Sequence, residues 1–61
     1  MKLWIARDAD NDLRMFTSQP YPRNGIYRTD EDNENFIFID SDMFPELTFE
    51  NSPQEVELKL V

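Results

Sequence analysis

The stretch KLWIARDADNDLRMF, residues 2–16, decides the fold because it predicts a β-hairpin. Residues 2–7 and 13–16 are rich in strand-forming side chains, and a short polar segment separates them. We take residues 9–11 as a three-residue loop, in which the last residue adopts the left-handed conformation. Asn11 holds that position, and asparagine tolerates this conformation better than most residues.

This loop fixes which residues face each other across the hairpin. Trp4 is expected opposite Phe16, and Ile5 opposite Met15. The two apolar pairs lie on opposite faces of the hairpin, which stabilises one register against a shift by one residue.

The same stretch raises a calcium interpretation, because Asp8, Asp10 and Asp12 alternate as ligands do in calcium loops. A calcium-binding helix-loop-helix needs glycine at the sixth loop position and glutamate at the twelfth. Counted from Asp8, these positions hold Leu13 and Gln19. The pattern therefore favours a turn, and weak calcium binding is kept only as an alternative function.

Beyond the hairpin, FIFID at residues 36–40 is the most strand-like stretch of the chain. Apolar residues point to both sides of residues 36–39, which predicts a central strand covered on both faces. The alternative is a strand with one face covered by another subunit.

The C-terminal third predicts a turn and a second hairpin. Asp40 or Ser41 can cap a helical turn near residues 41–44, which Pro45 stops. With residues 51–54 as a loop, Phe49 is expected opposite Val56 and Leu47 opposite Leu58. This arrangement also sets Glu50 against Glu55, where like charges repel.

Together these segments predict one small domain, residues 1–61, of mainly β class, with a small α+β fold as the variant. The expected architecture is an antiparallel sheet of about four strands with one short helical turn near residues 41–44. A chain of 61 residues has little core, and without cysteine it has no disulfide to constrain the unfolded state. Eight aromatic residues are the expected compensation.

The residue types that are missing exclude much chemistry. Without Cys or His, the common nucleophile–base pairs and zinc sites cannot form. Gly25 is the only glycine, so a glycine-rich phosphate loop is excluded. Carboxylate pairs are available, but so small a domain has little room for a substrate cleft. We predict a protein that is not an enzyme and that carries no cofactor.

The charge is concentrated in the second half of the chain. The formal net charge is −7, and residues 30–61 hold ten acidic side chains and one basic one. Such a surface repels phosphate, which predicts no direct nucleic-acid binding. Six acidic residues are the candidate partner-binding set: Asp30, Glu31, Asp32, Glu34, Asp40 and Asp42.

Three interpretations of these six residues stay open beside simple solubility. They are expected to meet a protein partner, to act as an acidic nucleic-acid mimic that binds a basic DNA-binding protein, or to form a weak cation site. The opening residues lack the long apolar run of a signal peptide, and no stretch has transmembrane length. These features predict a cytoplasmic protein without a membrane segment.

Both ends of the chain resemble a known group of sequences. The opening MKLWIARDADNDLRMF and the ending MFPELTFENSPQEVELKLV are similar to short uncharacterised proteins of Bacteroides-type intestinal bacteria and their mobile elements. In that family the position of Asn11 is usually glycine. The resemblance implies a small intracellular domain of no known activity and supplies no catalytic residue. The expected function is a non-catalytic interaction or accessory module that binds a protein partner or a second copy.

Overall fold

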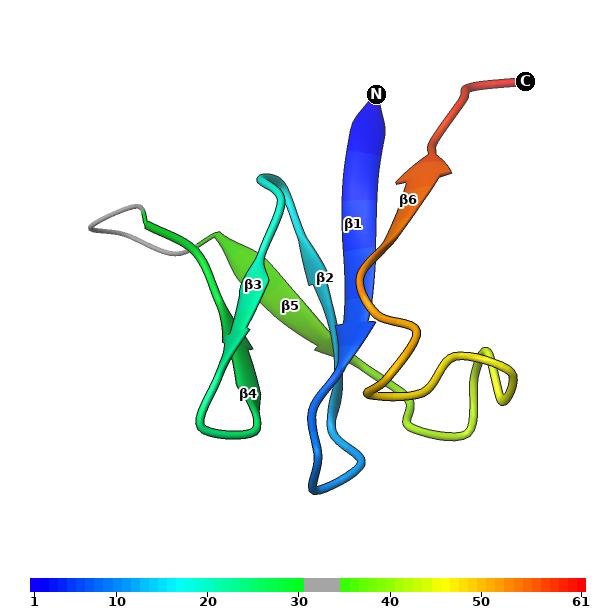
Figure 1. The fold of residues 1–61 in the computed structure, drawn as a ribbon. Helices are drawn as coiled ribbons and strands as arrows, with labels where there is room; N and C mark the ends of the chain where they lie inside the picture. Colours follow the sequence, from blue (N-terminus) through cyan, green and yellow to red (C-terminus); the bar gives the residue numbers. More distant parts are fainter. Residues whose placement is uncertain (31–34) are drawn as a thin grey trace.

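The computed structural model describes residues 1–30 and 35–61, which form six strands and no helix (Figure 1). Four strands make one antiparallel sheet in the order β5-β2-β1-β6, and the other two make a separate antiparallel pair, β3-β4. The predicted mainly-β fold with a four-stranded antiparallel sheet is confirmed. Within the described part, no helix has the length and hydrophobicity needed to span a bilayer. The strands are β1 (Lys2–Arg7), β2 (Leu13–Phe16), β3 (Tyr21–Arg23), β4 (Ile26–Arg28), β5 (Phe36–Ile39) and β6 (Gln54–Glu57).

The β1–β2 hairpin has the predicted register. Trp4 pairs with Phe16 and Ile5 with Met15. The Asp8 amide donates to the Asp12 carbonyl at 2.8 Å, which closes the loop, and Asn11 has a φ of 82°. Loop chemistry and side-chain pairing therefore specify the same hairpin.

The sheet separates two apolar clusters. On one face, Ile5 and Leu13 pack with Leu47. On the other face, Ala6 and Phe16 pack with Tyr27 of the β3–β4 pair. Asn24 and Gly25, with φ of 54° and 79°, form the tight turn of that pair, as type I′ hairpin turns require.

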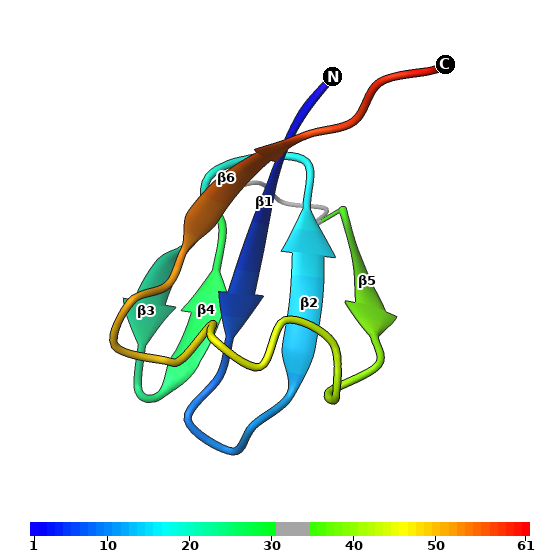
Figure 2. The same cartoon turned by 90° about the vertical axis from the view of Figure 1, so that its right-hand side faces the viewer.

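The prediction that residues 36–39 form a central strand is wrong, because β5 lies at an edge of the sheet (Figure 2). The central strands are β1 and β2. The prediction rested on the apolar residues that residues 36–39 carry on both faces, which indicated that both faces are buried. In the structure, the side chains of Ile37 and Phe38 remain 59% and 65% exposed.

The predicted second hairpin is also wrong. Residues 46–50 form no strand, and β6 pairs with β1 instead, with Leu3 opposite Val56. The segment between β5 and β6, residues 40–53, crosses the sheet face in front of β1 and β2 (Figure 2) and is called the crossing segment below. Its Leu47 side chain packs in the core on that face. In this position Leu47 is only 4% exposed, and Glu55 pairs with Trp4 and not with the like-charged Glu50.

The predicted helical turn near residues 41–44 is a tight turn without helix. The Met43 amide donates to the Asp40 carbonyl at 3.0 Å, and the Asp42 amide to Asp40 Oδ1 at 2.9 Å. Phe44 then has a φ of 52°, which ends the turn before Pro45.

Tyr27 joins the β3–β4 pair to the crossing segment, and this contact makes stability depend on pH. Its hydroxyl lies 3.0 Å from the Phe49 carbonyl oxygen and 2.8 Å from that of Ser52. Burial, followed by the charges of Asp8 and Glu50, raises the pKa of Tyr27 above its ordinary value of 10.0. Because the raised pKa belongs to the folded state, the stabilisation is complete below pH 10 and is lost as the pH rises further.

We expect Tyr27→Phe to reduce this alkaline loss of stability, because phenylalanine has no proton to lose. At neutral pH the same variant should be less stable by about 1 kcal/mol, the usual value of one hydrogen bond. Urea unfolding of both proteins, near pH 8 and above about pH 10, measures the difference. An equal alkaline loss in both proteins would contradict the assignment to Tyr27.

Candidate functional site

The six predicted acidic residues do not form one described cluster. Asp40 and Asp42 lie in the exposed turn after β5, joined by the bond from the Asp42 amide to the Asp40 carboxylate. Asp30 follows β4, where its carboxylate is hydrogen-bonded to the Tyr21 side chain. That bond, followed by the charge of Asp30, raises the pKa of Tyr21. The other three predicted residues, Glu31, Asp32 and Glu34, lie outside the described residues.

The carboxylates of Asp8, Asp10 and Asp12 converge in the β1–β2 turn, with one oxygen from each within 4.8 Å of the others. Asp8 is buried, and its two oxygens lie 3.1 and 3.0 Å from Arg14 Nη2. It also accepts the Tyr27 amide at 2.8 Å. Asp10 accepts the Asp12 amide at 3.1 Å. Because Arg14 already supplies a positive charge to Asp8, the structure adds no support for the calcium hypothesis.

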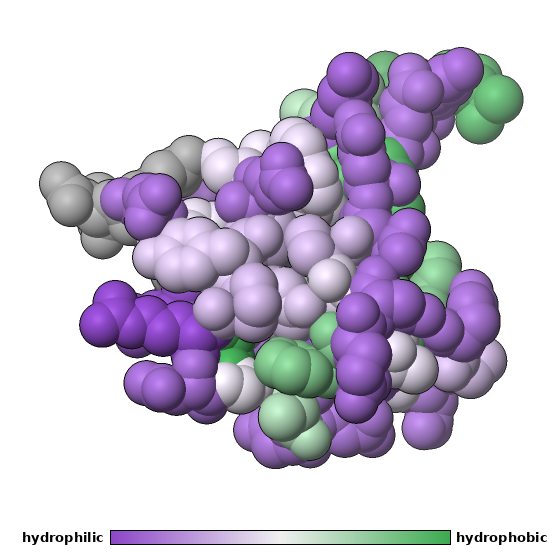
Figure 3. Space-filling view, in the orientation of Figure 1, coloured by the Kyte–Doolittle hydropathy of each residue, from purple (hydrophilic) through white to green (hydrophobic). Residues whose placement is uncertain are grey.

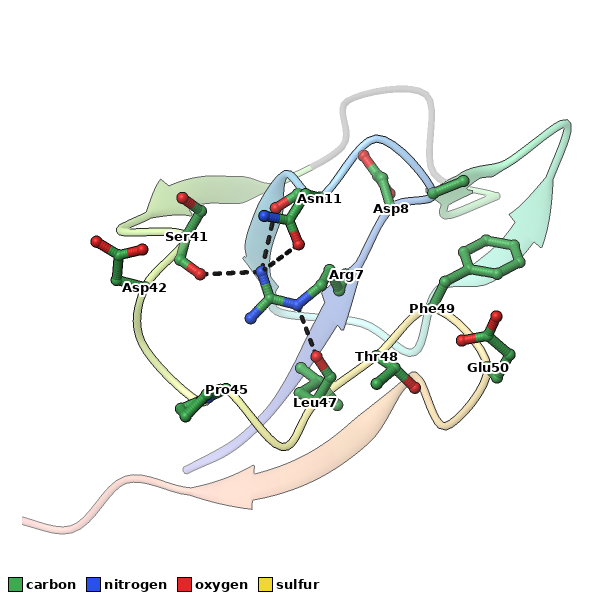
Figure 4. Close-up of a pocket in the computed structure, with 11 residues that line it drawn as sticks. Arg7, Asp8, Asn11, Ser41, Asp42, Pro45, Leu47, Thr48, Phe49 and Glu50 are labelled. Carbon is green, nitrogen blue, oxygen red and sulfur yellow. Dashed lines mark hydrogen bonds between the residues drawn. The ribbon is translucent and has the colours of Figure 1, made fainter.

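A second buried cation, Arg7, lies in an open groove of about 490 Å³ beside the crossing segment (Figure 4). Within the described part of the chain, no carboxylate forms an ion pair with it. Its guanidinium donates instead to protein oxygens at 2.6 to 3.2 Å, and Nε, Nη1 and Nη2 all take part. The acceptors are the carbonyl oxygens of Asn11, Ser41, Met43, Phe44 and Leu47 and the Asn11 side-chain oxygen.

With these donors occupied, Arg7 holds the crossing segment in place and is a poor anion receptor. Sequence analysis missed both Arg7 and the buried Asp8–Arg14 pair. A signal was present, because Arg7 continues the apolar alternation of Leu3 and Ile5 on one face of the hairpin. A charged residue at such a position must find internal partners when the strand is buried.

The outer edge of β5 is a further feature of the described residues that can engage another molecule. The Thr17 amide donates to the Asn35 carbonyl at 3.2 Å, which extends the β2–β5 register by one pair. Antiparallel ladders alternate between hydrogen-bonded and non-hydrogen-bonded pairs. Ile37 and Ile39 therefore bond to β2, while Phe36 and Phe38 direct their amide and carbonyl groups away from the sheet.

No described strand pairs with these outward groups. Comparisons with protein-family models, with curated proteins and with solved structures find no match. The resemblance to Bacteroides-type proteins stays a prediction, and the functional argument depends on the geometry of this edge.

Apolar side chains flank the open edge on both faces. Phe38 packs edge-on against Phe36 with ring centroids 5.5 Å apart. The Arg14 guanidinium lies 4.8 Å from the Phe36 ring centroid and 5.9 Å from that of Phe38, so it orients both rings from the sheet side. On the other face, Ile37 borders an open depression of about 360 Å³.

The opposite edge of the sheet, β6, differs in its side chains. The Met1 and Leu58 pair is hydrogen-bonded, so by the same alternation the outward groups of β6 belong to Glu55 and Glu57. Both carboxylates are exposed, and Glu55 lies 3.6 Å from the Lys2 ammonium. Charged residues of this kind protect edge strands from pairing. The face of the molecule that carries the β3–β4 pair is coloured mainly in hydrophilic purple, with a smaller hydrophobic patch (Figure 3). β5 carries no such charge.

Proposed function

We propose that this chain is a non-catalytic protein-interaction module that binds an extended segment of another protein along the outer edge of β5. The observation that carries the proposal is the open ladder of Phe36 and Phe38, with Ile37 and Phe38 more than half exposed beside it. Strand addition uses such an edge: main-chain hydrogen bonds give affinity and side chains on alternate faces give specificity.

The contrast between the two edges of one sheet supports the same proposal. Edge strands normally carry charges, prolines or bulges that prevent pairing with other chains. β6 has Glu55 and Glu57, whereas Phe36–Ile39 has neither a charge nor a proline. Since exposed, apolar edges favour aggregation, an unprotected one in so acidic a chain is best explained by a partner that covers it.

The chemistry of the buried polar groups supports a non-catalytic role. Arg7 donates to main-chain carbonyls, and Asp8 and Arg14 neutralise each other inside the fold. Groups held this way stabilise the structure and are not poised to transfer protons or attack a substrate.

The experiment removes one outward hydrogen-bond donor without changing a side chain. A chain of 61 residues is accessible to chemical synthesis, so the Phe38 amide can be N-methylated. The unmodified chain should capture a protein from a lysate, and the N-methyl-Phe38 chain should lose that protein. Both should have the same melting temperature, because the Phe38 amide makes no bond to β2.

The matched control is N-methylation of Glu55, an outward amide on the opposite edge. This chain should capture the partner as well as the unmodified one does. The proposal would be contradicted if the N-methyl-Phe38 chain still captures the partner. It would also be contradicted if N-methylation of Glu55 reduces capture as much as N-methylation of Phe38 does. N-methyl-Ile37 tests the assigned directions, because loss of an inward amide should lower the melting temperature.

A further inference from the structure

We propose that the segment accepted by β5 has an apolar core preceded by basic residues, and that it runs antiparallel to β5 with those basic residues beside Asp40 and Asp42. The inference rests on the proposed function, because it specifies the occupant of the same edge. It is carried by the charges at one end of the edge and by the apolar side chains along it.

Carboxylates collect at the C-terminal end of β5. Asp40 directly follows the strand and Asp42 lies in the same turn, and both are exposed. If the pairing of Leu13 with Ile39 is continued by one step, the exposed Asp12 stands opposite Asp40. The Arg7 guanidinium donates to the Ser41 carbonyl in the same turn at 3.0 Å, so it lies nearby and offsets part of this negative charge. The end of the edge therefore favours a positive occupant.

The middle of the edge favours apolar side chains on both faces of the incoming strand. Directly opposed residues of paired strands point to the same face. A residue opposite Phe38 therefore meets the ring on one face, and its neighbour opposite Ile37 lies on the other. There, Leu3 and Met15 line the depression beside Ile37.

The charge of the chain argues against a second copy as the occupant. Each copy carries a formal charge of −7, so self-pairing brings together two strongly acidic molecules. Phe36–Ile39 also offers no basic side chain that could neutralise Asp40 of another copy. A basic segment of a different protein relieves this repulsion.

The direction of the occupant follows from the sheet. Every described strand pair in this structure is antiparallel, and antiparallel pairing is slightly the more stable form. In an antiparallel pair, the N-terminal part of the incoming strand lies beside the C-terminal end of β5. The basic residues should therefore precede the apolar core.

The test uses three synthetic peptides with one apolar core: KRKTVIVT, its reordered form TVIVTKRK, and the acidic form EEETVIVT. Binding is followed through the amide resonances of β5 in a titration. KRKTVIVT should bind about threefold to tenfold tighter than TVIVTKRK, as expected for one or two exposed charge pairs, and EEETVIVT should bind most weakly. The Phe36 and Phe38 amides should shift most.

The matched variants each remove two carboxylates from an edge of the sheet. D40N/D42N should abolish the preference for KRKTVIVT, while E55Q/E57Q should keep it. Asparagine at position 40 retains the oxygen that accepts the Asp42 amide, so the turn should persist.

Four results would overturn the inference: equal binding of KRKTVIVT and EEETVIVT, equal effects of the two double variants, no binding of any peptide at β5, or a dimer in sedimentation that N-methylation of Phe38 abolishes. In each case the proposed function is tested separately, since lysate capture that depends on the Phe38 amide would still support an interaction module. Loss of that dependence would remove both.

Discussion

Arg7→Met is expected to leave the domain largely unfolded at room temperature. The variant keeps a long apolar side chain but removes the donors that hold five main-chain carbonyls between Asn11 and Leu47. The bond to Leu47 is buried and the other four are part-buried, and an acceptor shielded from water costs about 1–3 kcal/mol when it loses its partner. Two or three such losses match the total stability of a domain this size, about 3–9 kcal/mol at the usual value per residue.

Circular dichroism and urea unfolding would measure this effect. Arg7→Lys should be intermediate, because one ammonium group can donate to only some of the same carbonyls. Arg23→Met is the matched control, since Arg23 is exposed on β3, and it should change stability by less than about 0.5 kcal/mol. If Arg7→Met unfolds at the same urea concentration as the wild-type protein, the guanidinium does not hold the crossing segment.

Asp8→Ala should destabilise the domain by about 3–5 kcal/mol, because it leaves the buried Arg14 guanidinium without its counter-charge. It also removes the acceptor of the Tyr27 amide, and therefore loosens β4 from the hairpin. Asp10→Ala, at an exposed position in the same turn, should cost less than about 1 kcal/mol.

A double-mutant cycle separates the ion pair from the rest of the turn. Asp8→Ala/Arg14→Met should be more stable than Asp8→Ala alone, because the double variant buries no unpaired charge. Urea unfolding of the four proteins gives the coupling energy. Strictly additive effects would show that the two charges do not stabilise each other.

The first hairpin could be predicted to the residue because its information is local. Asn11 satisfies the left-handed loop position, and the pairs Trp4–Phe16 and Ile5–Met15 exclude a shifted register. Turn chemistry and pairing act over a dozen residues, so nothing distant in the chain overrides them.

The partner of β6 could not be predicted, because Leu3 and Val56 are far apart in the sequence. The alternation of residues 47–58 suited a hairpin, yet Leu47 was needed to cover Ile5 and Leu13. Periodicity shows that a residue is buried but does not show against which segment.

The proposed edge includes two of the six acidic residues singled out from the sequence. Asp40 and Asp42 lie where a partner could meet them, whereas Asp30 is engaged with Tyr21. The two-sided apolar character of residues 36–39 was recognised, but a strand inside a sheet and an exposed apolar edge strand have the same sequence pattern. Only the sheet order distinguishes them.

The contacts of Arg7 have a consequence for how freely this chain can change. The guanidinium holds Ser41, Met43 and Leu47 through their carbonyl oxygens, which every amino acid possesses. The spacing of this segment is therefore fixed, whereas the identities of Ser41 and Met43, both exposed, are left open to substitution. An insertion or deletion there would shift the carbonyls out of reach of the guanidinium. We therefore expect this region to change in evolution by substitution and not by insertion or deletion.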